Sequence, residues 1–264
     1  MLALRSTTEM NRRDFLIAAG LAGLGSLAPS RAFGMGEDER FTVAKLKYAN
    51  AGGWDPRSSA IRRMLLEVEK RTSIKVRTDV PVVTPESKQI YSQPFLSMSG
   101  ESAFGALSSD AVQNLRTYLK AGGFLLIDSA EGIQDGPFTS SAKRAIERIF
   151  PDRQLSPIPK DHVLYKSFYL IDKPVGRVAA AERMYGIYED DRLLLVLSPN
   201  DLMGAWARDN FGNWEYSVAP GGHRQREMAF RLGINLAMYA LCINYKADQV
   251  HVPFILRRRQ WKVD

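Results

Sequence analysis

The sequence contains few of the residues on which metalloproteins and thiol enzymes depend. Among its 264 residues there are one Cys and three His. No H-x-x-x-H or paired C-x-x-C spacing occurs, so there is no zinc framework. The glycine pairs Gly52-Gly53 and Gly122-Gly123 fit neither G-x-G-x-x-G nor a P-loop, which argues against a nucleotide cofactor. We therefore expect no metal and no cofactor.

The single cysteine, Cys242, cannot form a disulfide within the chain. It lies in the apolar stretch 236–243, whose pattern predicts a buried helix. A reactive thiolate needs an electropositive, partly open environment, whereas a Cys inside such a helix usually acts as a small apolar residue. The pattern therefore favours a structural Cys242 over a nucleophile.

Long hydrophobic runs are also missing. The longest weakly apolar run, 15–28, is too short to cross a hydrocarbon core of about 30 Å as a helix. Arg12-Arg13 followed by Phe15-Leu16 resembles a twin-arginine export signal, with cleavage after Ala32 or Gly34. We expect residues 1–34 to be this signal, whether translation starts at Met1 or Met10, and the protein to be periplasmic or otherwise exported. The alternative is a buried N-terminal helix.

The positive charge is concentrated at the two ends of the chain. The formal net charge is +7, but residues 1–34 carry four Arg against one Glu and one Asp. A basic tail, 251–264, contains Arg257, Arg258 and Arg259. The body between is close to neutral, so we expect no nucleic-acid partner. The tail predicts at most weak contact with an anionic membrane surface, and a solvated tail is the alternative.

Hydrophobic periodicity predicts a single α/β domain over residues 35–250. Apolar alternation or short apolar runs indicate strands, and apolar residues at i, i+3, i+4 and i+7 indicate helices. The expected strands are 41–49, 74–76, 93–99, 124–127 and 192–197, and the expected helices begin at Asp55, Ser108 or Ser109, Ser140 and Arg226. This order predicts a mostly parallel sheet with helices on both faces. Residues 151–190 and 198–225 are expected to be long insertions.

Several phrases together resemble a bacterial family known as domain of unknown function family 4159. They include Gly53-Trp54-Asp55, Gln93-Pro-Phe-Leu96 with Gly100, the run Leu119-Lys-Ala-Gly-Gly-Phe-Leu-Leu-Ile-Asp128, Asp161-His162 and Leu232-Gly-Ile-Asn235. The similarity extends from about Phe41 to Tyr245. It implies a relationship to the class I glutamine amidotransferase-like group, which includes trehalose-utilisation-like proteins, and hence a flavodoxin-like sheet.

The resemblance also carries expectations about function. In amidotransferases of this group the nucleophilic Cys stands at a sharp turn after a central strand. Here the corresponding strand, 124–127, is followed by Asp128 and Ser129, so glutamine hydrolysis by a thiolate is not expected. Some relatives carry this domain fused to membrane-anchored proteins of aerotolerance-type operons, which implies partners among cell-envelope proteins.

The candidate site residues follow from the expected sheet. Ligands of open parallel sheets bind beyond the carboxyl ends of the strands. The loops expected there, together with the Asp161-His162 pair, supply the candidates Trp54, Asp55, Gly100, Glu101, Asp128, Ser129, Asp161 and His162. Asp128 could act as a general base, ligand acceptor or metal ligand, or it could brace the following turn through backbone N–H groups. Asp128, Glu101 and Asp161 could form a hard-cation site only if the fold gathers them.

Two functional hypotheses remain open. The leading one is an exported ligand-binding or interaction module without catalytic activity, possessing an amidotransferase-like fold but not its nucleophile. The alternative is a periplasmic hydrolase or lyase acting on a small sugar-like metabolite, with Asp128 and His162 as base and acid. The alternative requires that these two side chains face one cleft.

Overall fold

The computed structural model of the chain describes residues 40–48 and 53–242. The expected export signal at residues 1–34 and the basic tail at 251–264 lie outside the described residues.

The centre of the domain is a seven-stranded sheet in the order β2-β1-β3-β4-β7-β6-β5. The first five strands in this order are parallel, and β6 and β5 extend the sheet in antiparallel fashion. The strands are β1 (Ala44–Leu46), β2 (Val82–Val83), β3 (Phe95–Gly100), β4 (Phe124–Ser129), β5 (Ser156–Pro157), β6 (Tyr185–Glu189) and β7 (Arg192–Ser198). The parallel part is doubly wound, with its switch point between β1 and β3. This arrangement confirms the flavodoxin-like α/β fold expected from the sequence.

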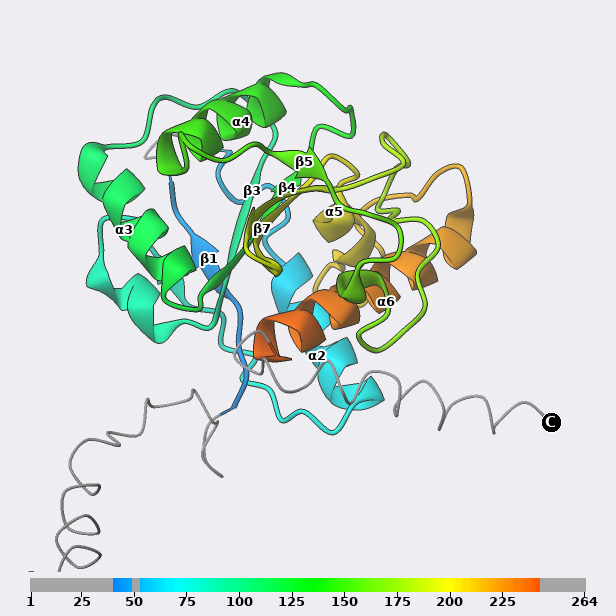
Figure 1. Cartoon of the computed structure of the whole chain (residues 1–264). Coiled ribbons are helices and arrows are strands. Elements are labelled where there is room, and N and C mark those ends of the chain that lie inside the picture. The colour runs from blue at the N-terminus through cyan, green and yellow to red at the C-terminus, as the bar shows by residue number, and fades with distance from the viewer. Residues whose placement is uncertain (1–39, 49–52, 243–264) are drawn as a thin grey trace, which may run out of the picture. The chain divides into compact units, whose positions relative to one another are not determined.

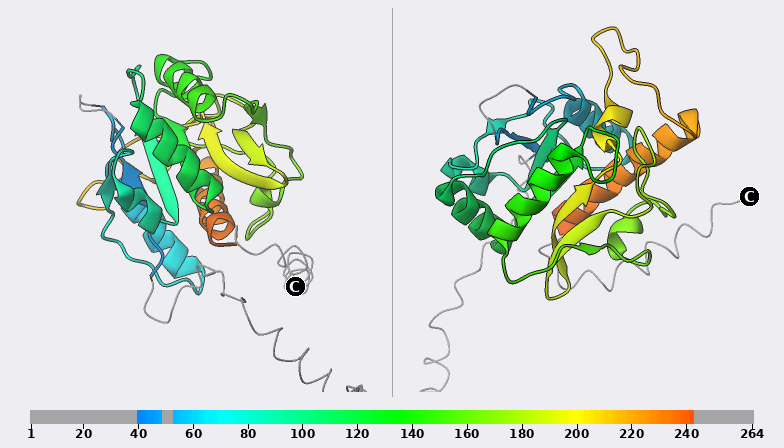
Figure 2. Two further views of the ribbon diagram at one scale, coloured as in Figure 1. Left: turned by 60° about the vertical axis from the view of Figure 1, so that its left-hand side comes forward. Right: turned by 90° about the horizontal axis from the view of Figure 1, so that it is seen from above.

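Helices cover both faces of the sheet (Figures 1 and 2). The first and last long helices, α2 (Ala60–Arg71) and α6 (Gly222–Cys242), pack on one face together with the short α5 (Leu202–Trp206). The opposite face is covered by α3 (Ser109–Lys120) and α4 (Pro137–Ile149). Two 3-10 helices, η1 (Lys88–Ser92) and η2 (Val163–Tyr165), lie in the connections.

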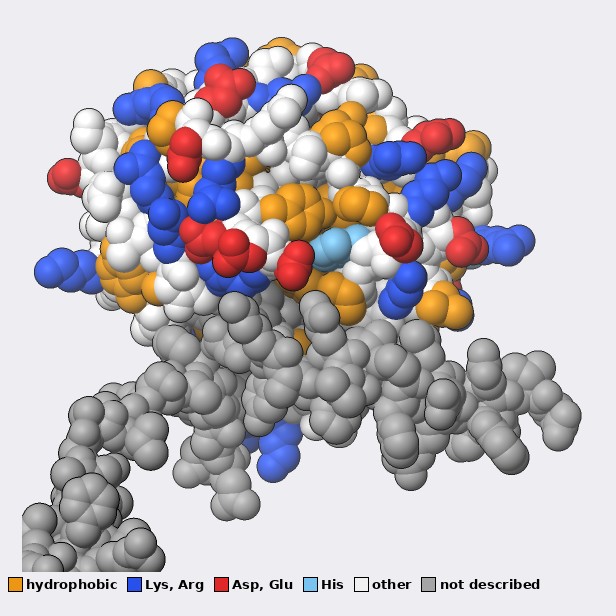
Figure 3. All heavy atoms as spheres, in the orientation of Figure 1, with side chains coloured by type: hydrophobic (Ala, Val, Ile, Leu, Met, Phe, Trp, Pro, Cys, Tyr) orange, Lys and Arg blue, Asp and Glu red, His pale blue; other side chains and the backbone are white. Residues whose placement is uncertain are grey.

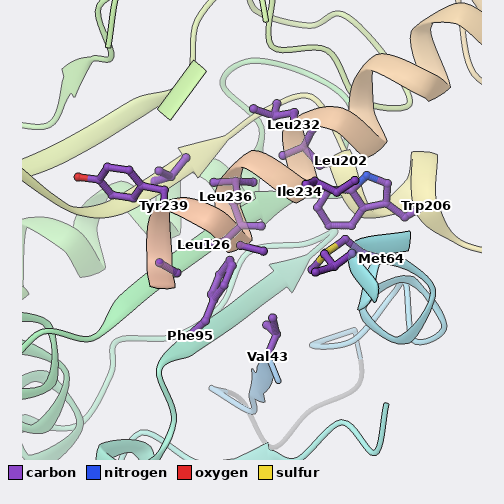
Figure 4. Packing of buried hydrophobic residues seen from close by; sticks show 14 of the residues in the cluster. Val43, Met64, Phe95, Leu126, Leu202, Trp206, Leu232, Ile234, Leu236 and Tyr239 are labelled. Atoms are coloured by element: carbon purple, nitrogen blue, oxygen red, sulfur yellow. The ribbon is translucent and has the colours of Figure 1, made fainter. Parts of the chain in front are cut away.

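The core is divided by the sheet into two apolar clusters because neighbouring residues of a strand point to opposite faces. On β4, Leu126 packs in the cluster beneath α2, α5 and α6, whereas Ile127 packs beneath α3 and α4. Figure 4 shows the first cluster, in which Trp206 lies beside Met64 of α2. Tyr239 of α6 packs against Phe124, the first residue of β4. Both clusters need β4 to be apolar on both faces, as its run of apolar residues predicts.

The long periodic elements lie where the sequence predicts them. β4 and β7 are parallel neighbours buried on both faces. Ser108 is the N-cap of α3, and its side chain accepts a hydrogen bond from the Ala111 N–H at 3.1 Å. The helix expected from Ser140 starts earlier, since Pro137 occupies its first turn.

Other expectations are wrong in detail. The N-cap of α2 is Ser59, not Asp55. Asp55 instead forms an ion pair with the Lys45 ammonium at 2.7 Å. The expected strand at 74–76 contributes only an isolated bridge between Val76 and Phe41, and the edge strand beside β1 is β2. Cys242, expected to be buried, is exposed at the end of α6.

The expected insertions contain structure of their own, held by two fully buried asparagines. In the insertion between α4 and β7, the Asn235 amide donates to the carbonyls of Leu164 and Tyr169 at 3.0 and 2.8 Å. The Asn200 amide donates to the carbonyls of Pro174 and Ala181 at 2.6 and 3.0 Å. Because each amide satisfies several backbone groups at once, the two side chains hold the segment between η2 and β6, which has no helix or strand of its own.

On the face shown in Figure 3, Lys and Arg side chains are interspersed with Asp and Glu. Over the described range, no helix has both the length and the apolar character needed to cross a bilayer.

Candidate functional site

The carboxyl ends of three central strands place a polar row on the α5 side of the sheet. Ser99 of β3 is opposite Asp128 of β4, which in turn is opposite Ser198 of β7. All three residues are buried, with exposed fractions of 5%, 0% and 0%. Ligands of doubly wound sheets bind at this edge, so the row is a candidate binding or catalytic site.

Asp128 uses both of its carboxylate oxygens to hold α5. The N–H of Leu202 donates to Oδ1 at 3.0 Å, and the N–H of Met203 donates to Oδ2 at 2.8 Å. These N–H groups belong to the first turn of α5, where no intrahelical acceptor is available. Asp128 therefore stabilises backbone N–H groups, which is the structural role considered for it from the sequence. The groups belong to a helix more than seventy residues further along the chain, however, and not to the following turn.

The environment of Asp128 raises the pKa of its carboxyl to about 7. Burial is the largest cause, because it disfavours the charged form, and the nearby Asp201 carboxylate acts in the same direction. The two backbone N–H groups and the Ser198 hydroxyl oppose this increase by hydrogen bonding to the carboxylate.

Asp201 lies beside Asp128 and is the acceptor for two arginines. The Arg57 guanidinium donates from Nε to Oδ1 at 3.1 Å and from Nη2 to Oδ2 at 2.9 Å, and Arg177 also pairs with Oδ2. Asp201 has a left-handed backbone with φ of 52° and caps α5 through the Gly204 N–H at 2.9 Å. We call Asp128, Ser198, Asp201, Arg57 and Arg177 the strand-end cluster.

Arg57 is the residue that connects this cluster to its surroundings. It is only 7% exposed, donates to the Ala130 carbonyl at 3.1 Å, and stacks 4.0 Å above the Tyr216 ring. Two guanidinium groups face two carboxyl groups, so charge within the cluster is balanced when Asp128 is ionised. Sequence reasoning missed Arg57 and Arg177, because nothing in their local sequence signals a partner more than twenty residues away.

Ser129, the next candidate, supports the start of α4. Its hydroxyl donates to Glu131 Oε2 at 3.0 Å, and Glu131 accepts from the N–H groups of Phe138 and Thr139 at 2.7 and 3.2 Å. Ser129 is fully buried. Its hydroxyl is therefore placed to orient a capping carboxylate. Glu131 was not among the candidates, although an acidic residue shortly before Pro137 is typical of a helix start.

Gly100, at the switch point, lies against a closed aromatic cluster. A Cβ on Gly100 would lie 2.3 Å from atoms of both Tyr48 and Phe138, so this strand end has no room for a side chain. The rings of Tyr48, Phe104 and Phe138 pack with centroid distances of 4.7 to 6.0 Å. Glu101 is exposed next to Gly100.

Two further candidates contact lysines in and directly after β1. Trp54 is half-buried, and the Lys47 ammonium lies 5.9 Å from its ring. Asp55 forms the ion pair with Lys45 described above.

Asp161 and His162 lie at the opposite end of the sheet. His162 Nδ1 accepts from the Leu164 N–H at 3.1 Å, and its ring is 5.7 Å from the Tyr239 ring. Tyr239 contacts Phe124, the first residue of β4, with ring centroids 5.5 Å apart. Burial lowers the pKa of His162, and the neighbouring Asp161 carboxylate acts in the opposite direction.

Asp128 is four residues further along β4 than Phe124, which corresponds to about 13 Å at roughly 3.3 Å per residue. The structure therefore does not bring Asp128 and His162 to one cleft, and a shared acid–base role for them has no support. Nor does any group of three or more His, Cys, Asp or Glu side chains in the described part of the chain have an arrangement that could hold a metal ion.

Comparison with known protein families agrees with the phrases noted in the sequence. The model of the family described as domain of unknown function DUF4159 matches residues 42–241. The chain belongs to this family. The matched range includes every strand of the sheet, the strand-end cluster and the aromatic cluster at the switch point. Among curated proteins, none matches the chain significantly.

Proposed function

We propose that the protein is an exported, non-catalytic binding or interaction module. The observation that carries this proposal is the state of Asp128, which is fully buried and uses both oxygens to accept hydrogen bonds from α5. In the amidotransferase-like enzymes that the sequence resembles, the nucleophile stands at a sharp turn after the central strand. Asp128, which follows the apolar residues of β4, instead serves the architecture of the domain.

The neighbouring groups support the same conclusion. Ser129 is also fully buried and donates to Glu131. Cys242 lies on α6 three residues after Tyr239, which packs at the start of β4 and not at its end. Neither residue is placed to replace the missing nucleophile at the strand end.

Whether the protein is catalytic can be tested with a ligand panel. The purified protein is incubated with sugars, amino acids, peptidoglycan fragments and divalent cations, and both thermal unfolding and conversion are followed. We expect one class to raise the unfolding midpoint, since a ligand at 100 times its Kd stabilises by about 2.7 kcal/mol, and we expect no compound to be converted. Conversion at a rate proportional to protein concentration would contradict the proposal.

Export is proposed to follow the twin-arginine route. The support is the sequence Asn11-Arg12-Arg13-Asp14-Phe15-Leu16 ahead of a short Gly- and Ala-rich run. In a bacterial host with this pathway, the full chain carrying Arg12→Lys and Arg13→Lys should accumulate as uncleaved precursor in the cytoplasm. Arg5→Lys is the matched control and should be exported normally. Equal export of the wild-type chain, the double variant and the control would contradict the proposal.

At its destination we propose that the module works with cell-envelope proteins, a role that the fusions found in some relatives support. The basic tail containing Arg257, Arg258 and Arg259 would add only weak attraction to anionic headgroups, of about 1 kcal/mol per cation near the surface. Liposome binding that is unchanged by deleting residues 257–264 would exclude the contribution of the tail.

A further inference from the structure

A hollow of about 760 Å³ lies beside the first half of α2, and none of its lining residues belongs to the strand-end cluster. Its walls come from three segments that are far apart in sequence. They are the start of α2 with the preceding turn, residues 78–80 ahead of β2, and residues 208–210 after α5. A concave site of this size is large enough for a small metabolite.

Three arginines line this hollow, and two of them have no polar partner among the described residues. The side chains of Arg62 and Arg63 make no hydrogen bond or ion pair with any residue in the described ranges. At the other end of the same helix, Arg71 pairs with Glu67 at 2.6 Å and with Glu227 at 2.7 Å. The arginine at this end of α2 therefore has acidic partners, whereas Arg62 and Arg63 form no ion pair with the carboxylates that line the hollow.

The third arginine, Arg208, is held in a fixed position. Its guanidinium stacks 3.6 Å above the Trp214 ring, and Nη1 donates to the Gly212 carbonyl at 3.1 Å. Its Nε is buried and has no acceptor among the described residues. A buried donor without an acceptor is unfavourable, and a bound anion is one way to satisfy it.

The acidic residues of the hollow do not neutralise these arginines. Asp209 accepts from the N–H groups of Phe211 and Asn213 at 2.9 and 2.8 Å and from the Asn213 amide at 3.1 Å, so it is occupied within its own turn. Asp79 is exposed and forms no ion pair with a residue in the described part of the chain. The remaining polar lining includes Ser58, Thr78 and Asn210, which can donate to an oxyanion.

We propose that this hollow, with Arg62, Arg63 and Arg208, binds a small oxyanion-bearing ligand. Guanidinium groups fit the planar geometry of a carboxylate and the tetrahedral geometry of a phosphate, and both groups accept several hydrogen bonds at once. The site is separate from the strand-end cluster, and its existence does not depend on whether the protein is exported or catalytic.

The test is calorimetric titration of the purified protein with inorganic phosphate and, separately, with succinate, at constant ionic strength maintained with chloride. Saturable binding of either anion is expected. The double variant Arg62→Gln, Arg63→Gln should weaken it at least about tenfold, because two charge-assisted contacts are lost. The matched control, Arg183→Gln with Arg224→Gln, removes the same charge from exposed positions outside the hollow and should leave the affinity unchanged within about twofold.

Each outcome has a defined meaning. Tighter binding of phosphate assigns the site to phosphate esters, and tighter binding of succinate assigns it to carboxylates. Absence of saturable binding of both anions up to about 10 mM would overturn the proposal. Equal weakening in the two double variants would also overturn it, because it would show general charge attraction and not a site. Thermal unfolding of each variant verifies that the fold is retained.

Discussion

The strand-end cluster and the arginine hollow both gather charged side chains near α2, but they differ in how those charges are satisfied. At the strand ends, Arg57 and Arg177 pair with Asp201, and Asp128 accepts from two backbone N–H groups, all largely out of contact with solvent. In the hollow, Arg62 and Arg63 have no partner in the described part of the chain. A buried and paired charge is part of the architecture, whereas an accessible and unpaired charge is available to a ligand.

The largest expected effect comes from breaking the buried pair. Arg57→Ala leaves Asp201 buried with Arg177 as its remaining cationic partner in the cluster, so the free energy of unfolding should fall by about 3–5 kcal/mol. Urea denaturation measures the change. Arg224→Ala, at an exposed position of α6, is the control and should change stability by no more than about 0.5 kcal/mol. Similar values for the two variants would mean that the cluster is not structural.

The pH dependence of stability tests Asp128 itself. Because its folded pKa of about 7 lies above the value near 4 in an unfolded chain, the folded state retains a proton that the unfolded state has released between these pH values. Wild-type stability should therefore fall as pH rises through this window, by up to about 1.4 kcal/mol per pH unit, with no further loss from this group above it.

Asp128→Asn lacks this titration and isolates it from other groups. The difference in unfolding free energy between Asp128→Asn and the wild type should move in favour of the variant as pH rises from about 4 to about 7. Movement in the opposite direction would show that the amides of α5 hold the carboxylate in its charged form and lower its pKa.

A smaller effect is expected at the switch point. Gly100→Ala places a methyl group against Phe138 and Tyr48 and should cost about 1–3 kcal/mol through overpacking. Gly105→Ala is the matched control, because an added Cβ there meets no atom within 4 Å. A tolerated Gly100→Ala would show that this end of the sheet is open enough to accept a ligand, which would remove the contrast with the hollow.

The smallest effect on stability should come from the hollow. Arg62→Gln with Arg63→Gln removes no hydrogen bond or ion pair with the described residues and should change the unfolding free energy by about 0.5 kcal/mol or less. A large loss in thermal unfolding would show that these arginines belong to the fold, like Arg57.

The parts of the fold that were predictable are those with long local patterns. β4, β7 and α3 have enough consecutive residues for their apolar pattern to be unambiguous. β2 and β5 have only two residues each, too few to show any period, and their pairing comes from neighbours elsewhere in the chain. α5 lies in an expected insertion, and its start is stabilised by a carboxylate on another strand.

The candidate site was predictable in position but not in role. The strand-end rule placed Asp128 at the right edge of the sheet. Its partners, the N–H groups of Leu202 and Met203, are brought to it only by the folded chain, so the sequence alone could not distinguish a ligand acceptor from a helix cap. Arg62 and Arg63 were not predicted as site residues, because a charged pair on a helix ordinarily indicates a solvated face.

One measurement compares the two regions directly: backbone amide chemical shifts of the purified protein during titration with whichever of inorganic phosphate and succinate binds more tightly. We expect changes for residues 58–63 and 208–210, with the amides of Ser129, Leu202 and Met203 unaffected. Changes centred on Ser129, Leu202 and Met203, with residues 58–63 unaffected, would contradict it and return the functional site to the strand ends.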